Sequence, residues 1–230
     1  MDTYSQHMKA RGLEEYTVDG ALNHDAWNST PLKILFLLKE NYGYQGVGIF
    51  QTSDEAAGWL KARIKTYIKI VQLAALLHDA YADGRSLSVE RRRVILEDDR
   101  LMRETLNLIS VVNIKKHSGA SKSNDREIRY ESKKNADLLR EQISFLRPKI
   151  IITGGTVCWH SLTNDIRISK AVPPCPKNGS VCSEGMILCH ANHPSAWAGG
   201  GFDIDLLHRS ILSCLKSEPD GAGNRNRAKR

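Results

Sequence analysis

The stretch PLKILFLLKENYG, residues 31–43, contains an unbroken run of large apolar residues that stops at charged and polar ones. Such a run is typical of a strand covered on both faces of a sheet, because a one-sided strand or helix would be interrupted by polar residues. The stretch therefore predicts a buried strand from about Lys33 to Leu38 and a loop after it.

Three further stretches have the same character. LNLISVVNIKK, RPKIIITGG and GMILCHANHPS predict strands from Leu108 to Ile114, from Lys149 to Thr153 and from Met186 to Cys189. Helical patterns occupy residues 54–81, 89–103 and 125–146, and two more helices are expected after Gly155 and over residues 203–215. This alternation predicts an α/β protein, with three α/β/α layers around a mainly parallel four-stranded sheet.

The composition indicates one globular domain. The chain has 230 residues, of which 41% are hydrophobic and 26% are charged. We expect an N-terminal extension over residues 1–30, the domain over 31–216 and a disordered basic tail over 217–230. Because no apolar segment resembles a membrane span or signal region, we expect a cytoplasmic protein with no membrane partner. We also expect it to be a monomer.

The charge and the cysteines of the chain indicate which ligands and cross-links are possible. The formal net charge of +7 is compatible with binding to a polyanion. The five cysteines are irregularly spaced, which argues against a disulfide framework. Cys175, Cys182 and Cys189 lie near one another in the sequence, but a structural zinc site needs four ligands and no second close pair supplies them. No metal is therefore expected.

Polar side chains follow each predicted strand. The four segments are KENYG, NIKKHSGASKSND, TGGTVCW and HANHPSAW. Because ligands bind at the carboxyl ends of strands in open parallel sheets, an acid, an amide and an imidazole are expected at one edge. That combination predicts a binding or catalytic site.

The order of ILFLLKENYG, ISVVNIKK, LRPKIIITGG and NHPSA resembles the uracil-DNA glycosylase superfamily, over roughly Leu32 to Ile211. The resemblance implies an enzyme that flips a base out of DNA and hydrolyses its glycosidic bond without a cofactor, leaving an abasic site. DNA is therefore the expected partner.

The resemblance also implies catalytic roles. Glu40 matches an acidic position that stabilises positive charge on the sugar and activates water, with Asn41 as the alternative or partner. His193 is expected to stabilise negative charge on the departing base, and His190 is its nearest competitor. Lys39 and Tyr42 depart from the family pattern, so the turn geometry of the family's loop cannot be assumed for this chain.

Base recognition is assigned in the same way. Gly43 falls where the uracil-specific branch has a Tyr that blocks the 5-position of the ring. Phe50 is expected to stack on the extruded base, with a place in the core as the alternative. Asn113 is expected to read the base edge, since its amide has both a donor and an acceptor.

The predicted DNA contacts lie beside this site. Lys115, Lys116 and Lys122 suit a loop that follows phosphates, and Ser195 is expected to contact a phosphate. Trp197 is placed like the residue that replaces the extruded nucleotide, or else it covers the last helix.

The function predicted is a monofunctional DNA glycosylase. An open 5-position favours a 5-modified cytosine, such as glucosylated hydroxymethylcytosine of phage DNA, removed in antiviral defence. Uracil or mismatch removal in base excision repair is the alternative. Two alternatives belong to other functional classes: a nucleoside hydrolase and a non-catalytic nucleic-acid-binding protein.

Overall fold

The computed structural model describes residues 19–40, 65–83, 89–117, 119, 123–195 and 201–217. The strands in this part are β1 (Gly20–Ala21), β2 (Ile34–Leu38), β3 (Ile109–Asn113), β4 (Ile150–Gly154), β5 (Gly179–Ser183) and β6 (Met186–Ala191). The helices are α2 (His24–Ser29), α4 (Lys65–Asp83), α5 (Val89–Glu97), α6 (Asp99–Asn107), α7 (Asp125–Lys134), α8 (Ala136–Leu146), α9 (Thr156–His160) and α10 (Ile204–Ser217), and a π-helical segment, η1 (Ser161–Ile166), continues α9.

The strands form one sheet in the order β1-β3-β2-β4-β6-β5. The four predicted strands are neighbours and run parallel, since β2 pairs with β3 and β4, and β4 pairs with β6. The prediction of a four-stranded sheet was wrong, because antiparallel β1 and β5 extend it to a mixed six-stranded sheet. β1 has two residues and β5 reads GSVCS, so neither has the long apolar run that marks the other strands.

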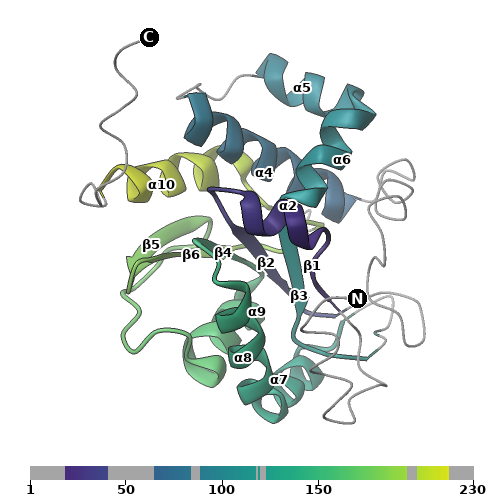
Figure 1. The fold of residues 1–230 in the computed structure, drawn as a ribbon. Coiled ribbons are helices and arrows are strands. Elements are labelled where there is room, and N and C mark those ends of the chain that lie inside the picture. Colours follow the sequence, from purple (N-terminus) through teal and green to yellow (C-terminus); the bar gives the residue numbers. More distant parts are fainter. Residues whose placement is uncertain are drawn as a thin grey trace.

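Helices cover both faces of the sheet (Figure 1). Ile34 and Phe36 of β2 belong to one buried cluster with residues of α4, α6 and α10. Leu35 and Leu37 belong to a second cluster with residues of α7, α8 and α9. Since neighbouring residues of a strand point to opposite faces, the apolar runs are explained by a sheet buried on both sides.

The segment before the first predicted strand packs against this sheet. Trp27 of α2 is 1% exposed, and its indole N–H donates to the carbonyl oxygen of Leu146 at 3.1 Å. Residues 20–29 therefore contribute a strand and a helix to the described fold, although the sequence placed them in an extension.

Two predicted helices are divided in the structure. The helix expected over 89–103 is interrupted at Asp98, whose carboxylate accepts from the backbone N–H groups of Arg100 and Leu101 and so begins α6. The helix expected over 125–146 is interrupted at Asn135, between α7 and α8. Of the helix expected over 54–81, residues 54–64 lie outside the described part. Among the described residues, no helix has the length and apolar character needed to cross a bilayer.

The strand order reverses direction around β2. β3 follows β2 in the chain and lies on one side of it, whereas β4 lies on the other side. In open α/β sheets, ligands bind beyond the carboxyl ends of the strands next to such a reversal. The loops after β2 and β3 are therefore the first place to look for a site.

Candidate active site

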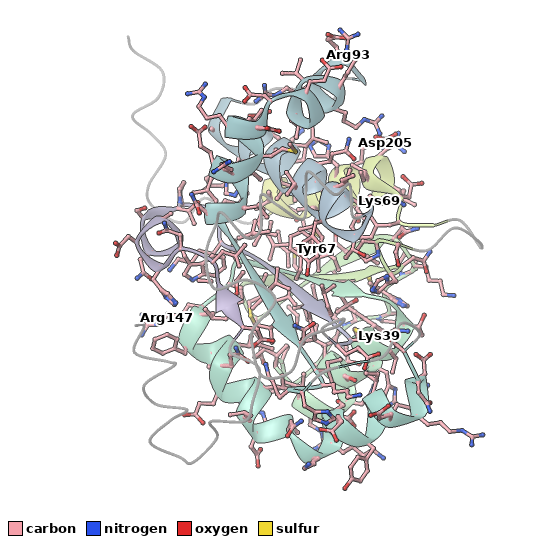
Figure 2. The ribbon with its side chains drawn as sticks, turned by 90° about the vertical axis from the view of Figure 1, so that its right-hand side faces the viewer. Lys39, Tyr67, Lys69, Arg93, Arg147 and Asp205 are labelled. Carbon is pink, nitrogen blue, oxygen red and sulfur yellow. The ribbon has the colours of Figure 1, made fainter. Side chains whose placement is uncertain are left out.

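The loops after the parallel strands meet at one edge of the sheet, which we call the rim. β2 and β3 end in register at Leu38 and Asn113, and the backbone N–H of Lys115 donates to the carbonyl oxygen of Lys39 at 3.0 Å beyond them. On the other side of β2, the end of β4 is bound to the end of β6, because the N–H of Gly155 donates to Ala191. Figure 2 shows Lys39 at this rim.

Glu40 is the acid of the rim, and its side chain is only 4% exposed. The ammonium of Lys115 lies 3.2 Å from its Oε2. Apart from this ion pair, neither carboxylate oxygen has a hydrogen-bond partner within the described part of the chain. Gly119 packs against this carboxylate so closely that a Cβ there would overlap it. Glu40 is therefore a buried carboxylate held by one cation.

Lys115 connects Glu40 to a second acid. Its Nζ lies 2.6 Å from Glu127 Oε1, and its side chain is 6% exposed. Burial opposes the charged ammonium, but the bonds to Glu127 and Glu40 prevail and raise the pKa of Lys115. The bond to Lys115 also lowers the pKa of Glu127. Lys115 is therefore a protonated, buried cation, which differs from the exposed phosphate contact that the sequence predicted.

Asn113 is completely buried at the end of β3. Among the described residues, neither Oδ1 nor Nδ2 of its side chain has a hydrogen-bond partner. Buried amides are almost always paired, because an unsatisfied group costs about 1–3 kcal/mol. Its amide therefore offers a donor and an acceptor that the described protein does not use.

A buried ion pair next to Asn113 was not indicated by the sequence. Lys116 is 1% exposed and donates to Asp19 and to Gln142, each at 2.7 Å. Gln142 also donates to Asp19 at 2.8 Å, and Asp19 accepts from the backbone N–H of Asn113. Burial lowers the pKa of Lys116, and the charge of Asp19 opposes this. The network fixes the end of β3.

This network corrects the predicted role of Lys116. The sequence placed Lys116 in an exposed loop that follows phosphates. Its ammonium is instead enclosed by Asp19 and Gln142, so it has no exposed charge to offer to DNA. The role of Asp19 depends on a contact with a residue 94 positions away, which no local pattern contains.

His193 follows β6, and its hydrogen bonds define which nitrogen carries the proton. Its Nδ1 accepts from the backbone N–H of Ser195 at 3.2 Å and lies 2.7 Å from Ser195 Oγ. Because a backbone N–H only donates, Nδ1 is unprotonated and the neutral ring has its proton on Nε2. Burial and the positive charge of Lys39 lower the pKa of His193 to about 4. At pH 7 the ring is thus a neutral donor. Ser195, predicted to contact a phosphate, here binds this ring.

Two glycines bring His193 close to the end of β4. A Cβ on Gly154 would lie 2.7 Å from Leu38 Cδ2 and 3.6 Å from His193 Cδ2. Gly155 has a φ of +115°, which favours glycine, and a Cβ there would lie 3.7 Å from Lys39 Cε. The missing side chains therefore leave space for both His193 and Lys39 at the rim.

His190, the competing histidine, lies within β6 and is 8% exposed. Its ring stacks on Trp159 of α9, with centroids 5.0 Å apart and an angle of 11°. Its Nδ1 lies 3.3 Å from the carbonyl oxygen of Cys175. His190 therefore takes part in the packing of β6 against α9.

The five cysteines are free thiols. Cys158 and Cys189 are buried, and burial raises the pKa of both, to about 12 for Cys158. Such thiols are poor nucleophiles. Across the described ranges, no three His, Cys, Asp or Glu side chains are grouped so that they could hold a metal ion.

Five predicted site residues lie outside the described part of the chain: Asn41, Gly43, Phe50, Lys122 and Trp197. Their roles stay predictions from the sequence.

No family model matches the chain, and no curated protein matches it. The similarity to the uracil-DNA glycosylase superfamily therefore stays a prediction from motifs, and the residues of the rim are the basis for a function.

Proposed function

We propose that this chain is a monofunctional DNA glycosylase, which flips a pyrimidine out of DNA and hydrolyses the bond between base and sugar. The observation that carries the proposal is a pair of buried side chains: among the described residues, the amide of Asn113 has no hydrogen-bond partner, and the carboxylate of Glu40 has only its ion pair with Lys115. Folded proteins rarely leave such groups unpaired unless a ligand completes them. Asn113 ends β3 and Glu40 lies just after the adjacent strand β2, so both belong to the rim.

Asn113 would recognise the base. A pyrimidine presents donors and acceptors along one edge, and an amide can pair with both kinds. Inside a duplex that edge is already paired, so recognition at the rim requires the nucleotide to be extruded.

His193 would stabilise the leaving base. Negative charge grows on the base as its bond to the sugar breaks, and a fixed hydrogen-bond donor lowers the energy of that charge. The assignment of the proton to Nε2 and the pKa of about 4 both support a neutral imidazole that donates at physiological pH.

Glu40 would act on the sugar and the water. As the bond from C1′ to the base nitrogen breaks, the sugar becomes positively charged, and a nearby carboxylate stabilises it. Water then adds to C1′, and Glu40 accepts its proton. Lys115 keeps Glu40 in place. Asn41, the alternative, could position water but could not accept the proton.

The lysines at the rim support hydrolysis by water rather than attack by an amine. Lys115 is held by Glu40 and Glu127, and Lys39 lies 2.7 Å from Asp125. A protonated amine has no lone pair for attack on C1′. We therefore predict that borohydride, which reduces an imine to a stable amine, traps no covalent adduct between the protein and its DNA substrate. A trapped adduct lost in Lys39→Gln would show that the reaction uses an amine.

The finer proposal concerns the base. Gly43 leaves the 5-position without the usual block, which favours a 5-modified cytosine, such as the glucosylated hydroxymethylcytosine of phage DNA, removed as an antiviral defence. Uracil or a mismatched base, removed in repair, is the alternative.

Two other classes make different predictions. A nucleoside hydrolase shares the bond chemistry but has no need to bind a duplex, so it would lack the steep salt dependence of DNA binding. A non-catalytic DNA-binding protein would keep its function after loss of Glu40 and His193.

The test is a set of duplexes that differ in one base: uracil, hypoxanthine, thymine opposite guanine, cytosine, hydroxymethylcytosine and its glucosylated form. Abasic products are detected by cleavage in alkali. We expect one class of base to be removed, and Glu40→Gln to lower the single-turnover rate by about 10²–10⁴-fold.

Glu127→Gln is the matched control, since it removes a carboxylate from the other side of Lys115. We expect it to lower the rate far less, because the proposal assigns the sugar and the water to Glu40 and gives Glu127 only the ion pair with Lys115. Cleavage of no duplex would contradict the proposal. Equal losses of rate in the two variants would show that Glu40 has no catalytic role of its own.

A further inference from the structure

The outer face of α7 is exposed and basic. Arg126, Arg129, Tyr130 and Lys133 are all exposed, and Tyr130 is 64% exposed. Their spacing of three, four and seven residues places them on one face of the helix. We call these four residues the α7 face.

The acidic residues of α7 are used elsewhere and do not neutralise this face. Asp125 binds Lys39, and Glu127 binds Lys115. Glu131 is buried. Within the described part of the chain, the side chains of Arg126, Arg129 and Lys133 have no ion-pair or hydrogen-bond partner.

A second arginine-rich helix, α5, shows the opposite arrangement on the other side of the sheet (Figure 1). Its consecutive arginines are all paired with acids: Arg91 with Asp79, Arg92 with Asp205, and Arg93 with Glu90. Figure 2 shows Arg93 well away from Lys39. Unpaired positive charge is therefore a property of α7 and not of every basic helix in this chain.

The α7 face begins at the rim. The first turn of α7 is tied there by two ion pairs, Lys39 with Asp125 and Lys115 with Glu127. A helix rises about 1.5 Å per residue, so the cations from Arg126 to Lys133 extend over roughly 10 Å from that point. DNA engaged at the rim would pass next to them.

We propose that the α7 face is the surface that binds the phosphates of duplex DNA next to the extruded nucleotide. The inference rests on the proposed function and replaces Lys115 and Lys116, whose ammonium groups are buried in ion pairs, as the predicted phosphate contacts. Arg126, Arg129 and Lys133 supply the charge, and the hydroxyl of Tyr130 supplies a further donor to phosphate oxygen.

The test measures binding of a short unmodified duplex by fluorescence anisotropy over a series of KCl concentrations. The variant is the triple substitution Arg126→Gln, Arg129→Gln and Lys133→Gln. The matched control, Arg147→Gln, Lys170→Gln and Lys216→Gln, removes the same charge from exposed residues of other segments. Figure 2 shows Arg147 across the molecule from Lys39.

Each phosphate contact contributes about 0.9 to the slope of log affinity against log salt concentration. We expect the α7 triple variant to reduce that slope by roughly two to three and to bind at least tenfold more weakly at low salt, while the control triple variant stays close to the unmodified protein. Equal losses in the two triple variants would overturn the inference, as would the absence of DNA binding by the unmodified protein.

The result is separable from the enzymatic proposal. Binding that depends on the α7 face, without release of any base, would retain the surface and reject the glycosylase. Base release by the unmodified protein, together with unaltered DNA binding in the α7 triple variant, would retain the glycosylase and reject the α7 face.

Discussion

At the scale of single residues, the proposed chemistry requires the carboxylate of Glu40 to lie in one position. Gly119 is the residue that defines this position, because a side chain there would occupy the same space. The carboxylate is also confined by Lys115, so it cannot move aside without weakening the ion pair.

We predict that Gly119→Ala lowers the rate of base release by about 10²-fold, which is the effect expected when a catalytic group is displaced by about 1 Å. The added methyl group should also cost about 1–3 kcal/mol of stability, as overpacking does. Single-turnover kinetics and urea denaturation measure the two effects. A folded Gly119→Ala protein with an undiminished rate would show that the reaction does not require this position of Glu40.

His193 gives a prediction about stability in acid. Its pKa is about 4 in the folded protein and 6.5 ordinarily, so between these values the unfolded chain binds a proton that the folded protein does not. The stability that the neutral ring preserves is complete above pH 6.5 and is lost as the pH falls towards 4.

Urea denaturation at pH 7.5 and pH 5 should therefore show a larger loss in the unmodified protein than in His193→Asn, which cannot titrate. Other histidines with a lowered pKa, such as His78, are present in both proteins, so the comparison isolates His193. The same loss in both proteins would mean that His193 is not held as a neutral ring.

At the scale of elements, the end of β3 is held by the network of Asp19, Lys116 and Gln142. Removing one member of a buried ion pair leaves the other charge unpaired, at a cost of about 3–5 kcal/mol. Removing both charges avoids that cost. We therefore predict that Lys116→Met alone is strongly destabilising, and that Asp19→Asn with Lys116→Met is less destabilising than the sum of the single variants.

Denaturant unfolding of the two single variants and the double variant provides the required comparison. Additive effects would mean that the two residues do not stabilise the fold as a pair. The same network binds the backbone of Asn113, so the single variants should also weaken base recognition.

The sequence was sufficient for the strands that are long and buried. β2, β3, β4 and β6 were predicted to within about two residues, because continuous apolar runs mark strands covered on both faces. β1 was missed because its two residues are a strand only through their pairing with β3. The divisions at Asp98 and Asn135 were missed because an interruption by a single polar residue does not alter the apolar periodicity.

The candidate site was predicted in part, for a similar reason. Glu40, Asn113 and His193 stand directly at strand ends, so the order of motifs was enough to bring them to one edge. The burial of Lys115 and Lys116 was missed, since lysines among serines and glycines resemble an exposed loop. Only the contacts with Glu127, Asp19 and Gln142 reveal their environment.

At the scale of the whole molecule, the fold separates stability from function. The two buried clusters on either side of the sheet contain the apolar residues of the strands. The rim beyond the strand ends contains buried polar groups instead, among them the amide of Asn113, which has no hydrogen-bond partner within the described residues. Beside it, α7 carries unpaired cations on its outer face, and this arrangement suits a polyanionic substrate that is engaged at one edge.

The central claim is that the rim breaks a glycosidic bond by hydrolysis, and the most direct test counts both products of one reaction. A duplex with the preferred base is incubated with excess protein, the free base is measured by mass spectrometry, and the abasic sites are measured in the same sample. The account predicts equal molar amounts of intact base and abasic site, and neither from the variant Glu40→Gln with His193→Gln. Absence of free base from every duplex, or equal release by that double variant, would contradict it.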